Sequence, residues 1–263
     1  MPTPKLPLAN RRIAITRARE QASELAQKLN ALGAEVVELP LIRISAEVDK
    51  QALADVMLEF GSYDWLVFTS ANGVRFFFEQ FFRLFDDIRA LGLIRLAGVG
   101  DATVAAIAAL HLKVECQPKI ATAENLADEL IGTGSLENAK VLVITGNLNR
   151  PIMMEKLQQA GAIVDLLQVY KTEATDLTGD PAVADFRRKG ADAILFASSS
   201  AVEAYAAMRA QAPFSPGITA PMAGSIGPQT SETMTRLGIT IGFCAKHPSL
   251  DELVAATVKA LRG

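Results

Sequence analysis

The chain has 263 residues, of which 50% are hydrophobic and 21% are charged, and its formal net charge at pH 7 is −3. This composition is typical of a globular protein with room for two domains, and it lacks the basic field that non-specific nucleic-acid binding requires. No apolar run is long enough to span a bilayer, and the first ten residues contain no signal-peptide core. We therefore expect a cytoplasmic protein that contacts neither nucleic acid nor membrane.

Two cysteines and two histidines are the only residues of these types in the chain. Cys116 and Cys244 occupy equivalent positions of the two sequence halves described below, far from each other in the sequence. This arrangement argues against a disulfide framework, a zinc site and a Cys/His nucleophile pair. We expect no metal site.

An internal duplication organises the sequence. The segment 63–74 is an apolar run of strand length, followed by a small-residue turn and a helical pattern, and the segment 191–202 repeats it. Ser70 and Ser198 mark equivalent places in the repeat, 128 residues apart. Because the same spacing relates other segments as well, the duplication is a stronger indication than any single motif.

The first half alternates strand and helix patterns. The expected elements are strand 12–16, helix 17–32, an extended run 35–44, helix 51–60, strand 65–68, helix 74–85, strand 96–100, a helix from residue 101, strand 114–117 and helix 123–131. Asp101 is the expected N-cap of its helix. Helix 74–85 contains six phenylalanines, so we expect it to pack on a sheet and leave open a further contact with another domain or subunit.

The second half continues this alternation, which predicts parallel sheets. The expected elements are strand 140–145, a helix from about residue 151, an extended run 162–172, helix 181–189, strand 193–196, helix 201–208, strand 222–226, helix 229–237, strand 240–244 and helix 250–261. The long extended runs 35–44 and 162–172 occupy equivalent places. They are the natural points for the chain to cross between two domains.

Positions at which the two halves differ are candidates for function, because the scaffold requirement is shared. Tyr170 stands where the first half has Ile42, and Arg17 stands where the second half has Thr145. The Tyr170 phenol is either a half-buried packing group or a functional group. The Arg17 guanidinium either binds a ligand carboxylate with two hydrogen bonds or remains a solvated charge.

Hydroxyl and amide side chains gather where strands end and helices begin. They are Ser70, Asn72, Ser198, Ser199 and Ser200, and Thr230 follows Gly227 in the first turn of its helix. The serines and the asparagine are expected N-caps, and free backbone N–H groups beside them can bind an anionic group. No P-loop, dinucleotide fingerprint, carboxylate pair or Ser/His/Asp set stands out.

Five motifs, in order along nearly the whole chain, resemble the uroporphyrinogen-III synthase family. They are Ile-Thr-Arg at 15–17, Phe-Thr-Ser-Ala-Asn-Gly-Val at 68–74, Val-Tyr-Lys-Thr at 169–172, Phe-Ala-Ser-Ser-Ser-Ala-Val at 196–202 and Ile-Gly-Pro-Gln-Thr at 226–230. The chain departs from the family pattern at Thr145, where arginine is usual, and at Ala197 and Ser199, where threonine and proline are common.

The resemblance implies two flavodoxin-like parallel-sheet domains joined by a two-stranded linker. Domain one would comprise residues 1–40 and 172–263, and domain two residues 41–171 with the linker strands. Periodicity alone would instead divide the chain once, near Asn138. The implied activity is that of a hydro-lyase of porphyrin, haem and sirohaem biosynthesis. It cyclises the linear tetrapyrrole hydroxymethylbilane to uroporphyrinogen III, with loss of water and inversion of ring D, and uses no metal or organic cofactor.

The resemblance also implies a set of site residues. Tyr170 would be catalytic, and the substrate would be bound by Arg17, Ser70, Asn72, Ser198, Ser200, Gly227 and Thr230. We expect a monomer whose ligand is the linear tetrapyrrole, and we also consider a transient contact with the preceding enzyme of the pathway. Two other classes stay open, a small-molecule binding protein without catalysis and a nucleotide- or flavin-dependent enzyme.

Overall fold

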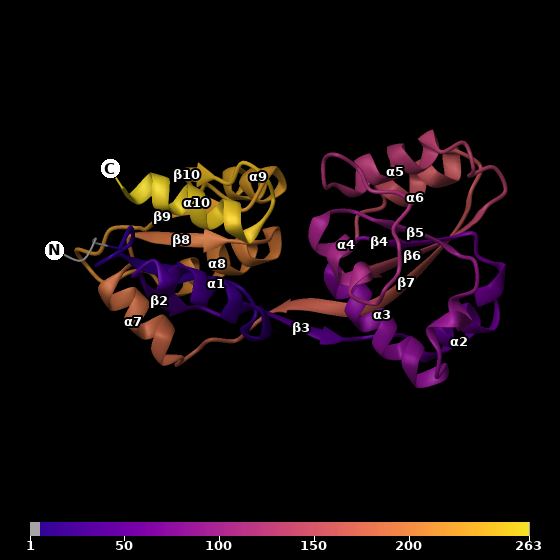
Figure 1. Ribbon diagram of the computed structural model, residues 1–263. Helices are drawn as coiled ribbons and strands as arrows, with labels where there is room; N and C mark the ends of the chain where they lie inside the picture. The colour runs from indigo at the N-terminus through magenta and orange to yellow at the C-terminus, as the bar shows by residue number, and fades with distance from the viewer. Residues whose placement is uncertain (1–5, 263) are drawn as a thin grey trace. The chain divides into compact units, whose positions relative to one another are not determined.

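The computed structural model describes residues 6–262 and divides the chain into two compact units (Figure 1). Unit 1 contains the described residues up to Ile44 and those from Glu173 onward, and unit 2 contains Ser45–Thr172. The boundaries implied by the family resemblance lie at residues 40 and 172, whereas the single division that periodicity predicts, near Asn138, falls inside unit 2. We propose that the two units are the two domains of the duplication.

Unit 1 contains a parallel sheet with the strand order β10-β9-β8-β1-β2. Its strands are β1 (Arg12–Ile15), β2 (Glu35–Glu38), β8 (Ala193–Phe196), β9 (Met222–Ser225) and β10 (Ile241–Cys244). Its helices are α1 (Arg19–Ala31), α7 (Pro181–Lys189), α8 (Ser199–Gln211), α9 (Pro228–Arg236) and α10 (Leu250–Leu261). Strands from the first and the last part of the sequence therefore share one sheet, in which β1 pairs with β8.

The alternation of side chains along the strands explains how unit 1 buries both faces of its sheet. Ile13 and Ile15 of β1 pack in one core with α1 and α10, whereas Ala14 between them packs in a second core with α7, α8 and α9. In β8, Leu195 belongs to the first core and Phe196 to the second. These central strands are apolar at nearly every position because helices cover both sides.

Unit 2 repeats this architecture with the strand order β3-β7-β6-β4-β5. Its strands are β3 (Ile42–Ala46), β4 (Trp65–Phe68), β5 (Arg95–Gly98), β6 (Lys140–Gly146) and β7 (Ile163–Ala174). Its helices are α2 (Lys50–Leu58), α3 (Ala71–Leu84), α4 (Asp101–Ala108), α5 (Ala123–Gly132) and α6 (Ile152–Gln159), with short 3-10 turns at Phe60–Ser62 and Ile88–Leu91. The order β7-β6-β4-β5 corresponds to β2-β1-β8-β9 of unit 1, so the duplication extends to the topology.

The fifth strand distinguishes the two sheets and corrects one expectation. The predicted strand 114–117 is wrong, because this segment makes only an isolated bridge between Ala97 and Cys116. Pro118 follows immediately and has no N–H with which to continue the ladder. Unit 1 has β10 at the corresponding edge, whereas unit 2 gains β3 at its opposite edge.

Two strands carry the chain from one unit into the other. The unit boundaries fall inside β3 and inside β7, which are neighbours in the sheet. Glu47 N donates to Val169 O and Thr175 N donates to Leu41 O, a reversed order that makes the pair antiparallel. The extended run 35–44 is therefore two strands, β2 and β3, which pair in different sheets on either side of Pro40. The two-stranded connection expected between two parallel-sheet domains is confirmed.

Capping side chains set where the helices begin. α3 and α8 start at Ala71 and Ser199, earlier than expected, because Ser70 Oγ accepts from Gly73 N and Ser198 Oγ accepts from Ala201 N. Asp101 is the first residue of α4 and not its N-cap. Its carboxylate instead accepts a hydrogen bond from Gln117 Nε2 at 2.7 Å, so Gly100 occupies the cap position.

The phenylalanine-rich helix α3 packs on the sheet of unit 2 as expected. Phe76, Phe77, Phe78 and Phe81 are buried, and the rings of Phe77 and Phe78 contact Phe68 of β4. Phe82 stays 43% exposed. The contact with another domain or subunit that the sequence left open stays a prediction.

Candidate functional site

Tyr170 lies in β7 beside the end of β6, in a cradle made by three neighbours. Its hydroxyl oxygen is 3.0 Å from Ser70 Oγ, and its ring stacks on Phe76 with centroids 5.8 Å apart and an interplanar angle of 21°. On the side of Gly146 the ring lies directly against the backbone, since a Cβ added to Gly146 would be 2.5 Å from two ring carbons. The ring is therefore fixed between an aromatic face and a glycine.

The cradle also affects the pKa of the Tyr170 phenol. Burial raises its pKa above the ordinary value of 10, and the hydrogen bond with Ser70 partly opposes that shift. The phenol is therefore protonated throughout the neutral range and has a proton to donate. Ser70 Oγ also accepts from Gly73 N, so the same oxygen links the phenol to the first turn of α3.

Asn147 holds the backbone of β7 at Tyr170 and at Thr172, two residues further along the strand. Asn147 N donates to Tyr170 O at 3.2 Å. The Asn147 side chain pairs with Thr172 as a backbone neighbour would, donating to Thr172 O at 3.1 Å and accepting from Thr172 N at 2.8 Å. The register between β6 and β7 shifts between Thr145 and Gly146, and Asn147 continues the pairing beyond that irregularity. These three hydrogen bonds fix the backbone of β7 at Tyr170 and therefore help to orient its side chain.

The sequence identified Tyr170 and Ser70 but missed Gly146, Asn147 and Phe76. A glycine directly after an apolar strand indicates a close approach of another group, which is the one sequence feature that points to this contact. Asn72 lies in the first turn of α3, half-buried, and is not the N-cap. Tyr170, Ser70 and Asn72 thus belong to unit 2 at the carboxyl ends of its strands.

The remaining predicted residues belong to unit 1. Arg17 follows β1, Ser198 follows β8, and Gly227 follows β9. These strands are neighbours and parallel, so the three loops emerge at one edge of the sheet. Ligands of open parallel sheets bind at such edges. This edge of unit 1 therefore carries five of the predicted site residues, Arg17, Ser198, Ser200, Gly227 and Thr230.

Arg17 is a half-buried cation at this edge. Its Nη2 donates to Gln21 Oε1 at 3.3 Å, which is a weak contact. Burial lowers the Arg17 pKa from its usual 12.5, and the charge of Glu24 partly opposes that shift. An arginine keeps its proton at neutral pH all the same, so the side chain can pair with a carboxylate.

The serines and Thr230 serve the helix ends of unit 1 in different ways. Ser198 caps α8 and its Oγ lies 3.0 Å from Ser200 Oγ, whereas Ser199 and Ser200 are in the first turn. Thr230 is 4% exposed, and Thr103 at the matching place of α4 is 3% exposed. Because both halves bury a threonine here, the Thr230 side chain has a structural role common to the two units, and its backbone N–H remains the group available to a ligand.

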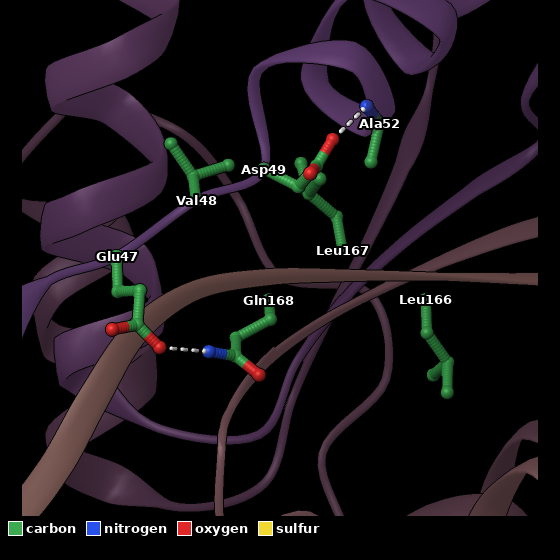
Figure 2. Close-up of a pocket in the computed structure, with 7 residues that line it drawn as sticks. All are labelled: Glu47, Val48, Asp49, Ala52, Leu166, Leu167 and Gln168. Atoms are coloured by element: carbon green, nitrogen blue, oxygen red, sulfur yellow. Dashed lines mark hydrogen bonds between the residues drawn. The ribbon is translucent and has the colours of Figure 1, made fainter.

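A pocket of about 430 Å³ lies elsewhere in unit 2 (Figure 2). Its lining comes from the segment after β3 and from the middle of β7, and Gln168 Nε2 donates to Glu47 Oε1 at 3.1 Å across it. Asp49 caps α2 at its rim by accepting from Ala52 N. None of the predicted site residues lines this pocket, so it is separate from the candidate site.

Within residues 6–262, no group of three or more His, Cys, Asp or Glu side chains is placed to hold a metal ion. In the same range, no helix is both long and apolar enough to cross a membrane.

Comparisons with known proteins agree on one family. The family model described as uroporphyrinogen-III synthase HemD matches residues 23–255. A uroporphyrinogen-III synthase of Synechococcus elongatus is 29% identical over 95% of this chain and 95% of its own length. The porphyrin biosynthesis protein HemD of Ruminiclostridium josui is 26% identical over 95% of this chain, which spans 48% of that longer protein.

A solved structure supports the fold. A mutant uroporphyrinogen III synthase from the extremely thermophilic bacterium Thermus thermophilus superposes with a TM-score of 0.65 at 18% identity, and the match covers 95% of this chain and 98% of the other. At that identity the likeness shows the fold alone, whereas the family model covers most of the sequence. The chain belongs to the uroporphyrinogen-III synthase family, whose members are cofactor-independent hydro-lyases of porphyrin biosynthesis that cyclise hydroxymethylbilane to uroporphyrinogen III.

Proposed function

We propose that this chain performs the family's cyclisation with Tyr170 as its proton donor and with the strand ends of both units as its substrate-binding groups. One observation carries the assignment of Tyr170. Its protonated phenol is held by Ser70 at the N-terminus of α3, where a polyanionic substrate is electrostatically favoured. Groups that bind anions and a group that donates a proton are thereby adjacent.

The chemistry needs only modest acid assistance. An electron-rich pyrrole expels its hydroxyl group readily, and a proton from Tyr170, direct or through a water, lets the group leave as water. The C–O bond breaks, and the remaining tetrapyrrole is a delocalised azafulvenium cation beside the tyrosinate. Attack by the substituted position of ring D gives a spiro intermediate, whose fragmentation and reclosure invert that ring. The proton released at the final step restores the phenol, so water is the only by-product.

Binding of the substrate rests on donors rather than on a strongly basic surface. Hydroxymethylbilane carries many carboxylates, and helix N-termini supply backbone N–H groups to such anions. In our proposal Ser70 and Asn72 serve in unit 2, and Arg17 adds a fixed positive charge in unit 1. Ser198, Ser200, Gly227 and Thr230 complete the binding set.

The main task of the protein in this proposal is orientation. The free substrate closes unassisted to the symmetric isomer, so a catalyst must hold ring D for attack at its substituted position. Because the free substrate closes spontaneously, its direct transfer from the enzyme that makes it would limit formation of the symmetric isomer. We therefore propose a monomer in the cytoplasm that receives the linear tetrapyrrole through a transient contact with the preceding enzyme.

The isomer composition of the product tests the function. Hydroxymethylbilane is generated in situ in the presence of the purified protein, the products are oxidised, and type I and type III uroporphyrins are separated by chromatography. We expect type III in excess over the protein-free control. Type I alone from a folded protein would refute the synthase assignment and favour a binding protein without catalysis.

A further inference from the structure

A chain of hydroxyl groups joins the first turn of α8 to the first two turns of α9. Thr233 Oγ1 donates to Ser199 Oγ at 2.9 Å, and Ser199 Oγ lies 3.3 Å from Gln229 O, to which it donates. Thr233 Oγ1 is also 3.0 Å from the same carbonyl oxygen. Thr233 is only 4% exposed, so water competes little for these bonds. Two helices that follow different strands are thus tied together at their N-terminal ends.

A second hydroxyl pair fixes the start of α9 to its own strand. Ser225 Oγ at the end of β9 lies 2.6 Å from Ser231 Oγ in α9, and Ser225 is fully buried. With Ser199 on one side and Ser225 on the other, the first turn of α9 has little freedom to move. Preorganised donors of this kind cost no reorganisation when a ligand arrives.

The linked N-terminal turns of α8 and α9 expose backbone N–H groups that can donate hydrogen bonds. The first N–H groups of a helix have no acceptor within the helix. In α8 these include the N–H groups of Ser199 and Ser200, and in α9 those of Gln229 and Thr230, because Pro228 has none. Since the hydroxyl chain connects these two turns, it sets how far apart the two sets of donors lie.

Unit 2 lacks both hydroxyl links at the matching places. Ala71 starts α3 where Ser199 starts α8, and α4 has Ala105 and Ala106 where α9 has Thr233. The pair Ser225 and Ser231 is matched by Gly98 and Val104, and a Cβ added to Gly98 would lie 3.3 Å from Val104 Cγ2. The scaffold therefore folds without the hydroxyl chain, which points to a purpose particular to unit 1.

We infer that Thr233 is a positioning residue for substrate binding, which acts through Ser199 to hold the N-termini of α8 and α9 as one paired receptor for a carboxylate group. The inference rests on the proposed function, because it takes the carboxylates of the tetrapyrrole as the ligand. It assigns no bond between Thr233 and substrate. The buried hydroxyl only fixes the spacing of the donors, so its removal weakens binding and leaves the chemical step alone.

The structure offers a matched control for the test. Thr233→Val keeps the shape of the side chain and removes the hydroxyl, and Thr233→Ser restores the hydroxyl. Thr257 in α10 is fully buried, and its Oγ1 donates at 2.7 Å to the carbonyl oxygen four residues earlier, whereas Thr233 Oγ1 lies 3.0 Å from the corresponding Gln229 O. Thr257→Val therefore removes the same kind of local bond without touching the link between α8 and α9.

Two measurements separate this inference from the proposed function. The first is the affinity for uroporphyrin III, the oxidised and fluorescent polycarboxylate form of the product, which reports binding without turnover. We expect Thr233→Val to weaken it about 3- to 10-fold, the size expected for one lost hydrogen bond. Thr233→Ser and Thr257→Val should bind as the wild type does. The second is the KM for hydroxymethylbilane, which should rise by a similar factor in Thr233→Val while kcat stays within about twofold.

Coupling between the two hydroxyls completes the test. Ser199→Ala should weaken binding as much as Thr233→Val does, and the double variant should be no weaker than either single one, because both remove the same link. Wild-type affinity in Thr233→Val, an equal loss in Thr257→Val, or additive losses in the double variant would overturn the inference. Failure of the wild-type protein to form the type III isomer would instead refute the proposed function.

Discussion

The two units share a strand order but differ at the carboxyl ends of their strands. Unit 1 has a charged and hydroxylated edge, with Arg17 after β1 and the chain from Thr233 to Ser199 between α8 and α9. Unit 2 has an aromatic edge, where Tyr170 lies between Phe76 and the backbone of Gly146. In our proposal the edge of unit 1 binds the anionic groups of the substrate, and the edge of unit 2 holds a protonated phenol.

Residues that serve the fold recur in both units, whereas candidate functional residues occur in one unit only. Ser70 and Ser198 cap equivalent helices, and Thr103 and Thr230 are buried at equivalent places, so these residues serve the fold in both units. A feature found in only one unit is not required by the topology that the two units share. By that criterion Tyr170 and the hydroxyl chain are the strongest candidates for function, and Ser70 combines both roles through its bond to Tyr170.

The largest expected effect comes from the phenol itself. Tyr170→Phe keeps the ring on Phe76 and removes only the proton donor, so kcat should fall by about 10²–10⁴-fold, as for a general acid. Tyr205 of unit 1 provides the control, because it is also buried and its ring contacts Phe196. Tyr205→Phe should turn over at the wild-type rate. Wild-type turnover in a well-folded Tyr170→Phe variant would remove Tyr170 from the mechanism.

Displacing the phenol without removing it should have the next largest effect. In Gly146→Ala the new methyl group overlaps the Tyr170 ring, which must shift and lose its position next to Ser70. A displacement on the order of 1 Å reduces turnover by about 10²-fold. Gly132→Ala in α5 is the control, since nothing lies within 4 Å of its added Cβ. The steady-state kcat of both variants decides the matter, and unchanged kcat in Gly146→Ala would mean that the ring position is unimportant.

Most of the fold is predictable from the sequence because it depends on local pattern. The duplication, the alternation of strands and helices, and the parallel sheets follow from apolar periodicity and the repeat spacing. The two wrong predictions, a strand at 114–117 and an N-cap at Asp101, also have local causes. The segment 114–117 has a strand-like pattern, yet Pro118 limits its pairing, and Asp101 has a capping residue's identity but bonds to Gln117 instead.

The candidate site was predictable only in part, because the hydrogen bonds that hold its residues in place join residues far apart in the sequence. Tyr170 and Ser70 were found from the difference between halves and from the cap position. Thr233 and Ser199 are 34 residues apart, and Asn147 and Thr172 are 25 apart. Which residues face each other in these pairs depends on strand register and helix packing, and neither is visible in a single sequence.

A smaller effect should distinguish the two equivalent caps. Ser70→Ala and Ser198→Ala each remove one N-cap, so each should lower the free energy of unfolding by about 1 kcal/mol. Ser70→Ala also removes the partner of Tyr170, so it alone should lower kcat, by about tenfold for one catalytic hydrogen bond. Denaturant unfolding and kcat are measured for both variants. Equal kcat values would show that the bond between Ser70 and Tyr170 has no part in turnover.

The smallest effect is one that is absent at neutral pH and emerges only in alkali. The chain has three tyrosines, Tyr63 and Tyr170 in unit 2 and Tyr205 in unit 1, and burial raises the pKa of each above the ordinary value of 10. The folded protein therefore keeps these protons to higher pH than the unfolded chain does. Their contribution to stability is complete below pH 10 and is lost as the pH rises through the folded pKa values.

Because unit 2 has two of these tyrosines and unit 1 has one, unit 2 should lose stability more steeply above pH 10. Tyr63→Phe should reduce that slope, since Tyr63 also donates to Asp165 at 2.8 Å and cannot ionise without losing this bond. The titration is followed by the ultraviolet absorbance of tyrosinate, and the stability of each unit by denaturant unfolding on either side of pH 10. Tyrosinate formation at pH 10 in the folded protein, to the extent seen for free tyrosine, would contradict the upward pKa shifts that burial of these phenols predicts.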